Sequence, residues 1–259
     1  MKFLKIEKKE RVAYLGLNRV DSLNALSRDF LQEIIETTNS LRDQAIKSEI
    51  RAMVLHSHSE KAFCVGADLK ERKGMNREET IATLDLLRAC MDGIACFPMP
   101  TIAVVEGFAL GGGLELALSC DMRIFSPNAK VGLSEASLGI IPGAGGTQRL
   151  SRLIGVARAK EVIFKAERIS GESAMELGIC NACDGEAYNL AEKWANQIAN
   201  NAPLSLRYSK EAIDMGSHLE LSQGLDCERQ SYLSVLDSED RIEGLKAFAE
   251  KRNPNYQGK

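Results

Sequence analysis

The sequence TIAVVEGFALGGGLELALSCDMRIF, residues Thr101–Phe125, decides the fold. It opens with the apolar, β-branched run Thr101–Val105, which is typical of a buried strand. Three glycines, Gly111–Gly113, separate this run from Leu114–Cys120, which consists largely of good helix formers. A strand, a glycine turn and a helix in this order direct unpaired backbone N–H groups toward whatever lies at the helix N-terminus. We therefore expect an α/β fold with a ligand-binding site at this turn.

A similar arrangement follows in the next residues. Asp121–Phe125 is a second strand pattern, Lys130–Glu135 leads the chain back toward the first turn, and Ile141–Arg149 is a second glycine turn that enters a helix. Glu115 lies in the first turn of the first helix, and Glu135 lies on the return segment. Two carboxylates beside an N–H donor suit proton transfer at a carbon next to a polarised carbonyl. The residues alone also allow a simpler interpretation, in which the glycines form a packing turn and both glutamates are solvated.

Composition and charge exclude several functional classes. The 259 residues are 44% apolar and 27% charged, which is typical of a globular protein that buries a large core. A net charge of −3 gives no electrostatic reason to bind nucleic acid or an anionic membrane, and no apolar run reaches the ~20 residues that cross a bilayer. The seven cysteines are scattered, and the N-terminus shows neither a signal peptide nor a transit peptide, so we expect a cytoplasmic protein.

No metal or nucleotide motif is complete. His56 and His58 have no further ligand nearby at metal-binding spacing, so we expect them in a polar loop. Cys180–Cys183 spans a single C-x-x-C, without a second pair or a thioredoxin-like context. Gly143–Gln148 lacks the last glycine of the dinucleotide fingerprint, and there is no Walker lysine. The residues therefore predict no metal site and no nucleotide cofactor.

The rest of the chain divides into a mixed part and a helical part. Residues 3–17 alternate like a hairpin, and Ser27 is placed to cap a helix that runs to about Lys47. Ser170 is placed to cap another helix that ends near Gly178. From about Glu186 the chain is nearly all helix. Four segments there have periodic apolar faces: Tyr188–Asn200, Leu204–Met215, Leu219–Leu236 and Asp240–Lys251.

Three motifs in the centre of the chain carry a family resemblance. They are Gly107–Asp121, Gly132–Glu135 and Ile141–Arg149, and together they resemble the crotonase (enoyl-CoA hydratase/isomerase) superfamily. Four further matches lie outside the centre: Ser22–Leu26, Lys61–Glu71, Arg168–Ser170 and Glu243–Arg252. The resemblance covers essentially the whole chain in the family's order, so it is far more specific than a single glycine motif.

The resemblance implies the crotonase (ClpP-like) fold, an α/β architecture in which repeated ββα units form a sheet-based spiral core. On this basis residues 1–185 form the catalytic core, and residues 186–259 form a C-terminal helical trimerisation region. The resemblance also implies self-association as a homotrimer, commonly paired into a homohexamer.

The activity implied by the resemblance is that of an enoyl-CoA hydratase. Such a lyase of fatty acid β-oxidation and lipid metabolism adds water to a 2-enoyl-CoA thioester and gives a 3-hydroxyacyl-CoA. The backbone N–H groups of Ala67 and Gly112 form its oxyanion hole. Glu115 activates the water, and Glu135 relays a proton to the α-carbon. Coenzyme A enters as part of the substrate, so no separate cofactor and no metal are expected.

The resemblance also implies a set of substrate-contacting residues. They are Ser22, Ala25, Val65, Ala67, Asp68, Leu69, Lys70, Gly111, Phe248 and Lys251. Relatives often supply the last two positions across a subunit boundary. Val65 stands where the family more often has alanine or serine, which leaves the fit of the coenzyme A channel open. For the lysines, a role as solvated surface charges remains an alternative.

Two groups within the superfamily provide alternatives, and one of them includes a protein that binds RNA. Two glutamates favour a hydratase over a Δ3-Δ2 enoyl-CoA isomerase, which typically manages with one. The glycine-glutamate motifs are closest to the methylglutaconyl-CoA hydratases, one of which also binds AU-rich RNA through lysines on its first helix. Arg28–Glu36 is acidic here and lacks those lysines, so no nucleic-acid binding is expected. The acyl group stays open, because straight-chain, branched and carboxylated enoyl groups all fit.

Overall fold

The computed structural model describes residues 1–259 and contains two β-sheets. The larger sheet has the order β1-β2-β3-β5-β7-β10, with all neighbours parallel except the β1–β2 hairpin. Its strands are β1 (Leu4–Lys9), β2 (Val12–Leu17), β3 (Ala52–Ser57), β5 (Thr101–Val105), β7 (Met122–Phe125) and β10 (Ala182–Cys183). The smaller sheet has the order β4-β6-β8-β9. Its strands are β4 (Ala62–Cys64), β6 (Phe108–Leu110), β8 (Lys130–Gly132) and β9 (Ile169–Ser170).

The chain alternates between the two sheets and then forms a helix, which confirms the predicted ββα repeat. β3 and β4 lead to α2 (Leu69–Arg72) and α3 (Arg77–Ala95). β5 and β6 lead to α4 (Gly112–Leu118), and β7 and β8 lead to the 3₁₀ turn η2 (Glu135–Leu138) and α5 (Gly146–Ile154). Because β4, β6 and β8 are parallel neighbours, the turns that follow them meet at one edge of the smaller sheet. All residues of the predicted site core lie on these turns.

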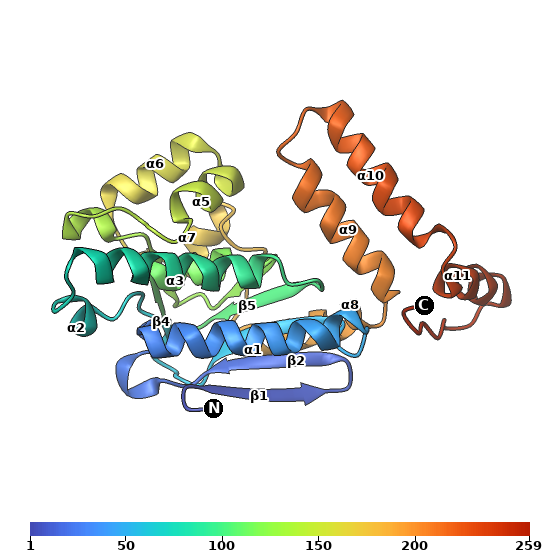
Figure 1. The fold of residues 1–259 in the computed structure, drawn as a ribbon, viewed down its shortest axis with the longest axis horizontal. Coiled ribbons are helices and arrows are strands. Elements are labelled where there is room, and N and C mark those ends of the chain that lie inside the picture. Colours follow the sequence, from blue (N-terminus) through green and yellow to red (C-terminus); the bar gives the residue numbers. More distant parts are fainter.

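Local sequence signals explain where the long helices begin. The Ser27 side chain accepts a hydrogen bond from the Phe30 amide and starts α1 (Arg28–Ile46), as predicted. Asn76 and Glu79 form a capping box that starts α3. Helices α1 and α3 lie side by side over the sheets (Figure 1). One continuous core of aliphatic and aromatic side chains fills the space beneath them.

Close contact between α4 and β4 depends on a glycine. A Cβ on Gly113 would overlap the carbonyl oxygen of Cys64, so no larger residue fits here without movement of the backbone. This contact brings the first turn of α4, with Glu115, next to the end of β4. The three glycines therefore serve both the packing of α4 against β4 and the position of Glu115 in the site.

Four helices complete the chain after β10. Helix α8 (Ala187–Ala199) lays an alanine face on the larger sheet, whereas α9 (Pro203–Gly216), α10 (Leu221–Leu236) and α11 (Glu239–Glu250) extend away from both sheets (Figure 1). We call these last three helices the C-terminal arm. Large apolar side chains of the arm are exposed: Ile213, Met215, Leu221, Leu225, Tyr232, Leu233, Ile242, Leu245 and Phe248. The division at residue 185 and a trimerisation role for residues 186–259 stay predictions.

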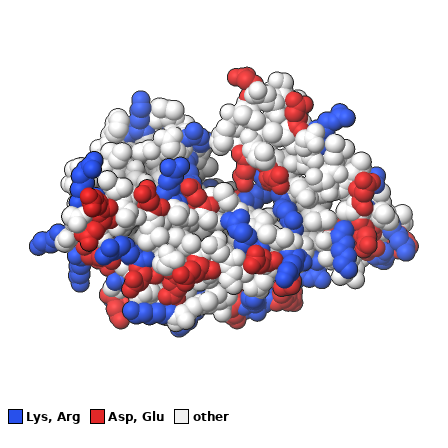
Figure 2. Space-filling view, viewed as in Figure 1, with Lys and Arg blue, Asp and Glu red and all other residues white.

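The remaining elements and the surface add two observations. Ser170 caps α7 (Gly171–Glu176), which follows α6 (Val156–Lys165), as the sequence predicted. His56 is not in a polar loop: it lies buried in β3, and its ring packs against those of His58 and Tyr188. No helix is both long and apolar enough to span a bilayer. Figure 2 shows positive and negative side chains interspersed over the face in view.

Candidate active site

A cavity of about 80 Å³ lies at the turns that follow β4, β6 and β8. Four predicted residues, Ala67, Gly112, Glu115 and Glu135, all line it. The predicted contacts Val65, Leu69 and Gly111 line it as well. The structure therefore brings together, from three separate ββα units, the residues expected to carry the chemistry.

Two backbone amides face this region without an acceptor. The N–H of Ala67 donates to no group in the chain, and the N–H of Gly112 belongs to the first residue of α4, where no intrahelical partner exists. A Cβ on Gly112 would lie 3.6 Å from the Ala67 nitrogen, so the two amides are close neighbours. Gly66 allows this approach, because its φ of +87° and its 2.7 Å Cβ distance to the Leu110 oxygen exclude a side chain.

Glu115 is almost fully buried, and two backbone amides hold it. Its Oε1 accepts hydrogen bonds from the Ala144 N–H at 2.8 Å and from the Gly146 N–H at 2.7 Å. Burial raises the pKa of Glu115, while these two hydrogen bonds and the charge of Arg149 oppose the rise. Its second oxygen accepts no hydrogen bond from the protein, so it remains available to a substrate water.

Glu135 has the opposite environment. Its Oε2 is buried and has no hydrogen-bond partner. Burial raises the pKa of Glu135 to about 7, and the charge of Glu115 adds to the rise, while its own backbone amide and Arg72 oppose it. Gly111, at φ +51°, makes room for this carboxyl, because a Cβ there would lie 2.8 Å from Oε1 of Glu135. Near neutral pH Glu135 therefore holds a proton for a large part of the time.

The two segments that the resemblance assigned to coenzyme A lie side by side. Val65 donates to the Leu23 oxygen, Leu26 donates to the Gly66 oxygen, and Asp68 donates to the Leu26 oxygen. This ladder joins the end of η1 (Val20–Ser22) and the turn after it, with Ser22 and Ala25, to the turn after β4, with Val65 and Asp68.

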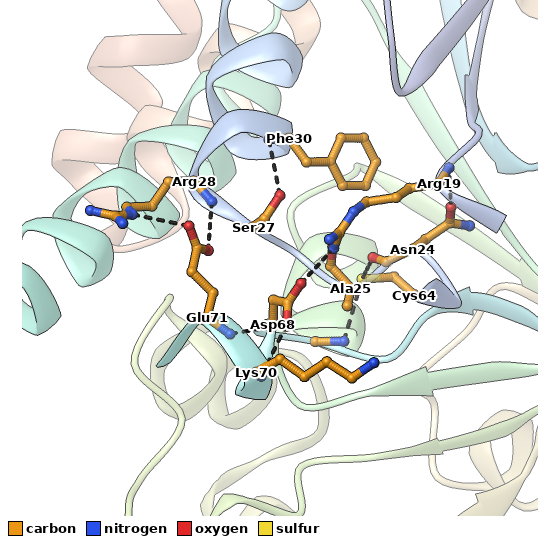
Figure 3. Close-up of polar contacts among 11 residues, drawn as sticks. Arg19, Asn24, Ala25, Ser27, Arg28, Phe30, Cys64, Asp68, Lys70 and Glu71 are labelled. Atoms are coloured by element: carbon orange, nitrogen blue, oxygen red, sulfur yellow. Dashed lines mark hydrogen bonds and ion pairs between the residues drawn. The ribbon is translucent and has the colours of Figure 1, made fainter. Parts of the chain in front are cut away.

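Asp68 is the hub of a polar cluster in this region (Figure 3). It accepts from the Lys70 and Glu71 amides and pairs with Arg19 at 2.8 Å. Arg19 also donates to the Ala25 oxygen. Burial alone would raise the pKa of Asp68, but the Arg19 and backbone hydrogen bonds hold it below its usual value. The Lys70 side chain makes no ion pair within the chain, and Figure 3 shows it extended away from Asp68.

Phe248 and Lys251 do not join the site within one chain. Phe248 is 87% exposed on α11, and Lys251 ends that helix. Helix α11 and α2, which flanks the site, lie at opposite ends of the molecule (Figure 1). Any contact of these two residues with coenzyme A requires a second copy of the chain.

Several residues of the site carry no signal that sequence reasoning could use. The amides of Ala144 and Gly146 hold Glu115, but any residue supplies an amide. Arg149 fixes their turn by donating to the Ala144 oxygen at 2.9 Å while it pairs with Asp92 at 2.8 Å. Arg72 lines the cavity from the end of α2, and no sequence motif distinguishes it from the charged residues around it.

Proteins of known name are similar to the whole chain. Enoyl-CoA hydratase domain-containing protein 2, mitochondrial, of Homo sapiens is 44% identical over 249 residues, which cover 94% of this chain and 84% of the relative. Methylglutaconyl-CoA hydratase, mitochondrial, of Rattus norvegicus is 40% identical over 258 residues, with 97% and 81% covered. The crystal structure of an enoyl-CoA hydratase from Bacillus anthracis has a TM-score of 0.97 and 42% identity, with 100% of both chains covered.

These comparisons correct one prediction. A cytoplasmic location is contradicted, because the human and rat relatives are named as mitochondrial proteins. The prediction depended on scattered cysteines and on the character of the N-terminal residues. Reduced thiols fit any reducing compartment, so the cysteine pattern does not distinguish one such compartment from another.

The family itself follows from the extent of the match. A family model described as enoyl-CoA hydratase/isomerase matches residues 7–259, nearly the whole chain. The alternating two-sheet fold, the paired amides and the two buried glutamates are the features that the resemblance implied. The chain belongs to the enoyl-CoA hydratase/isomerase family and has the crotonase fold.

Proposed function

We propose that this chain hydrates 2-enoyl-CoA thioesters to 3-hydroxyacyl-CoA. The observation that carries the proposal is the difference between the two glutamates that share the cavity. Glu115 is oriented by two amides, and Glu135 is unpartnered with a pKa of about 7. Hydration needs one carboxylate that accepts a proton and one carboxylic acid that donates one, and environments of this kind separate those roles.

The paired amides provide the electrophilic step. The thioester oxygen accepts hydrogen bonds from the Ala67 and Gly112 N–H groups, which withdraws electrons from the conjugated double bond and makes the β-carbon electrophilic. These donors stabilise the enolate-like charge of the transition state, by about 3 kcal/mol for each donor in comparable sites.

The glutamates then move two protons. Glu115 takes a proton from water as the water oxygen bonds to the β-carbon, and the π electrons move onto the thioester oxygen. Glu135 gives its proton to the α-carbon as the carbonyl re-forms. Glu115 ends protonated and Glu135 ends ionised, so proton exchange within this coupled pair or with solvent restores the starting state.

A Δ3-Δ2 isomerase is the second candidate, and one observation favours it. Glu135 makes no hydrogen bond through Oε2, so this carboxyl alone is free to take a proton from one carbon and return it to another. Isomerisation needs no water, and hence no base of the Glu115 kind. The two candidates therefore differ in their dependence on Glu115.

Variants of the two glutamates test the proposal. Hydration of crotonyl-CoA is followed by the loss of the ultraviolet absorbance of the conjugated thioester, and isomerisation of a 3-enoyl-CoA by its gain. Glu115→Gln and Glu135→Gln should each lower hydration by about 10²–10⁴-fold. Glu106→Gln, a half-buried glutamate outside the cavity, is the matched control and should keep the wild-type rate. A near-normal hydration rate in either site variant would contradict the assignment. Isomerisation that survives only in Glu115→Gln would identify the second candidate as a side activity.

We also propose that the chain self-associates as a trimer or a pair of trimers. The exposed apolar residues of the C-terminal arm support this, as does the distance of Phe248 from the site of its own chain. Size-exclusion chromatography with light scattering tests it. A monomer at micromolar concentration would overturn it.

A further inference from the structure

A polar cavity of about 490 Å³ lies outside the candidate active site. Three segments form it: the turn between β1 and β2, the end of α8, and the tail that follows α11. Figure 1 shows these segments at the opposite end of the larger sheet from α2. The cavity shares no lining residue with the one that contains Glu115, so it offers a separate place for a ligand.

Arg51, which stands directly before β3, is buried at this cavity. Only 2% of its surface is exposed. Its guanidinium donates to two carbonyl oxygens, that of Tyr256 at 2.7 Å and that of Ala199 at 3.4 Å, and to no carboxylate. Its Nε has no hydrogen-bond partner. Removal of a cation from water costs free energy unless an anion and hydrogen bonds compensate for it, so Arg51 lacks part of that compensation.

The other buried arginine of the chain is better satisfied. Arg123, which is 5% exposed, donates from Nε to the Ile179 oxygen at 2.8 Å. It also donates from Nη1 to the Cys120 oxygen at 2.7 Å. Burial in this fold therefore does not by itself leave an Nε without a partner, and the gap at Arg51 is a property of its own surroundings.

Arg11 brings a second positive charge to the same place. It is exposed in the turn between β1 and β2, and it donates to the same Tyr256 oxygen at 3.4 Å. Two guanidinium groups thus meet at one carbonyl oxygen. Burial lowers the pKa of Arg51, the charge of Arg11 lowers it further, and the charge of Asp240 opposes both.

No nearby carboxylate forms an ion pair with either arginine. Glu10 lines the cavity but pairs with neither of them. The two oxygens of Asp240 accept hydrogen bonds from the Gln257 amide at 2.6 Å and from the Gly258 amide at 2.8 Å. Each guanidinium has up to five N–H donors, so most donors of the two arginines remain unused. The cavity therefore has an excess of positive charge and of donors, which suits an anion.

The arrangement favours phosphate over carboxylate. The two guanidinium groups come from different segments, so they approach an anion from two directions. A planar carboxylate matches one guanidinium, whereas a tetrahedral phosphate presents oxygens to both and carries nearly two negative charges near neutral pH. Three side-chain amides on the cavity wall suit hydroxyl groups: Asn196, Asn200 and Asn255. The volume of about 490 Å³ lies in the range of small-molecule sites.

We propose that Arg11 and Arg51 bind a phosphate group in this cavity, either the free ion or the monoester of a small polar molecule. The site does not depend on the proposed function, because it lies outside the cavity of the two glutamates.

Calorimetry with inorganic phosphate, at constant ionic strength, tests the site in the full chain. The wild-type protein should bind phosphate with a dissociation constant of about 1 mM or lower, because two charged hydrogen-bond pairs provide that range. Arg11→Met should weaken binding at least ~10-fold. Arg51→Lys should weaken it by a smaller factor, because lysine keeps the charge but loses the planar fork of donors.

Arg158→Met is the matched control. Arg158 is exposed on α6, lies outside the cavity lining and changes the net charge by the same amount when it is replaced. It should leave the dissociation constant at its wild-type value. Equal weakening by Arg11→Met and Arg158→Met would overturn the assignment, and so would the absence of binding at about 10 mM phosphate. If Arg51→Lys does not fold, the wild-type protein and Arg11→Met decide the matter, because Arg11 is exposed.

Three competitors identify the anion and its source. Malonate, which carries two planar carboxylates, should displace phosphate at least ~10-fold less well than phosphate binds, and equal affinity would overturn the preference for phosphate. AMP and coenzyme A each carry a phosphate monoester. Displacement by AMP supports a small organic monoester, and displacement by coenzyme A alone supports a phosphate of coenzyme A itself. Phosphate that neither compound displaces supports the free ion as the ligand.

Discussion

The segments that carry Glu115 and Glu135 both bury a carboxyl group, but they surround it with different hydrogen-bond partners. Both bury a carboxyl beside a glycine that leaves room for it: Gly146 for Glu115 and Gly111 for Glu135. Glu115 stands on a helix and is held by two amides from a separate turn. Glu135 stands on a 3₁₀ turn, and Oε2 of its carboxyl has no partner. The same residue type is thus oriented in one place and left free to titrate in the other.

Under the proposed function, this difference separates an acid from a base within one cavity. Hydrogen bonds from amides favour the charged form of Glu115 and fix its direction, which suits a group that must face a water molecule. Burial with no hydrogen bond at Oε2 favours the neutral form of Glu135, which suits a group that must deliver a proton.

The largest effect is expected from the glycines. Gly111→Ala and Gly146→Ala place a Cβ 2.8 Å and 2.9 Å from the Oε1 atoms of Glu135 and Glu115, so each carboxyl must move. A displacement of this size lowers kcat by about 100-fold. Gly74→Ala is the control, because nothing lies within 4 Å of its Cβ position. If Gly111→Ala and Gly146→Ala had the same kcat as Gly74→Ala, the two carboxyls would tolerate this displacement.

A smaller effect is expected from Arg149→Met. This change frees the turn whose amides hold Glu115 and removes a charge that lowers the pKa of Glu115. The base must be ionised, so a higher pKa moves the acidic limb of the pH–rate profile to higher pH. The rate below that limb falls about 10-fold, since hydrogen bonds to charged groups contribute about 1.5–3 kcal/mol. Arg152→Met, on the exposed side of the same helix, should leave the profile in place. An unshifted limb in Arg149→Met would contradict the role of this arginine.

The smallest effect concerns stability rather than rate. The pKa of Glu135 rises from 4.5 to about 7 on folding, so the folded state binds more protons than the unfolded state between these values. Its contribution to stability is complete below pH 4.5 and is lost as the pH rises through 7. Glu135→Gln removes this loss. The free energy of unfolding of the variant, relative to that of the wild type, should therefore be about 1–3 kcal/mol larger at pH 8 than at pH 4.

Urea unfolding of the wild-type protein and Glu135→Gln at both pH values measures this gain. Glu115→Gln should show a smaller gain, because the amides that hold Glu115 stabilise its charged form. A pH-independent difference between wild type and Glu135→Gln would show that folding does not raise the pKa of Glu135.

The sequence predicted the parts of the structure that depend on residue type and spacing. The caps Ser27 and Ser170 could be read directly, because a hydroxyl before an apolar-periodic run satisfies a free amide. The order of strand, glycine turn and helix also predicted that Glu115 and Glu135 lie near each other, because it depends on residue type and spacing as well. What pattern reasoning could not provide is the identity of amide donors, since the hydrogen bonds of Ala144 and Gly146 do not depend on their side chains.

Tertiary contacts decided the remaining cases. His56 and His58 looked like loop residues, but β3 continues through His56 and packs it against α8. Arg72 differs from the lysines and arginines around it only in the direction of its side chain, which the fold sets. Phe248 and Lys251 lie far from the cavity within one chain, so the structure of a single copy does not bring them to the site that the resemblance assigned to them.

The two donors that we propose for the thioester oxygen, the N–H groups of Ala67 and Gly112, belong to the main chain, and this has a consequence for how the site tolerates substitution. Exchange of a side chain leaves a peptide N–H in place, proline excepted, so every variant that keeps the backbone of these two turns also keeps both donors. Under the proposed function, a change of reaction would then depend on the side chains at positions 115 and 135 rather than on a new pair of amide donors. Redesign of the site can therefore keep the amides of residues 67 and 112 and vary only the residues at positions 115 and 135.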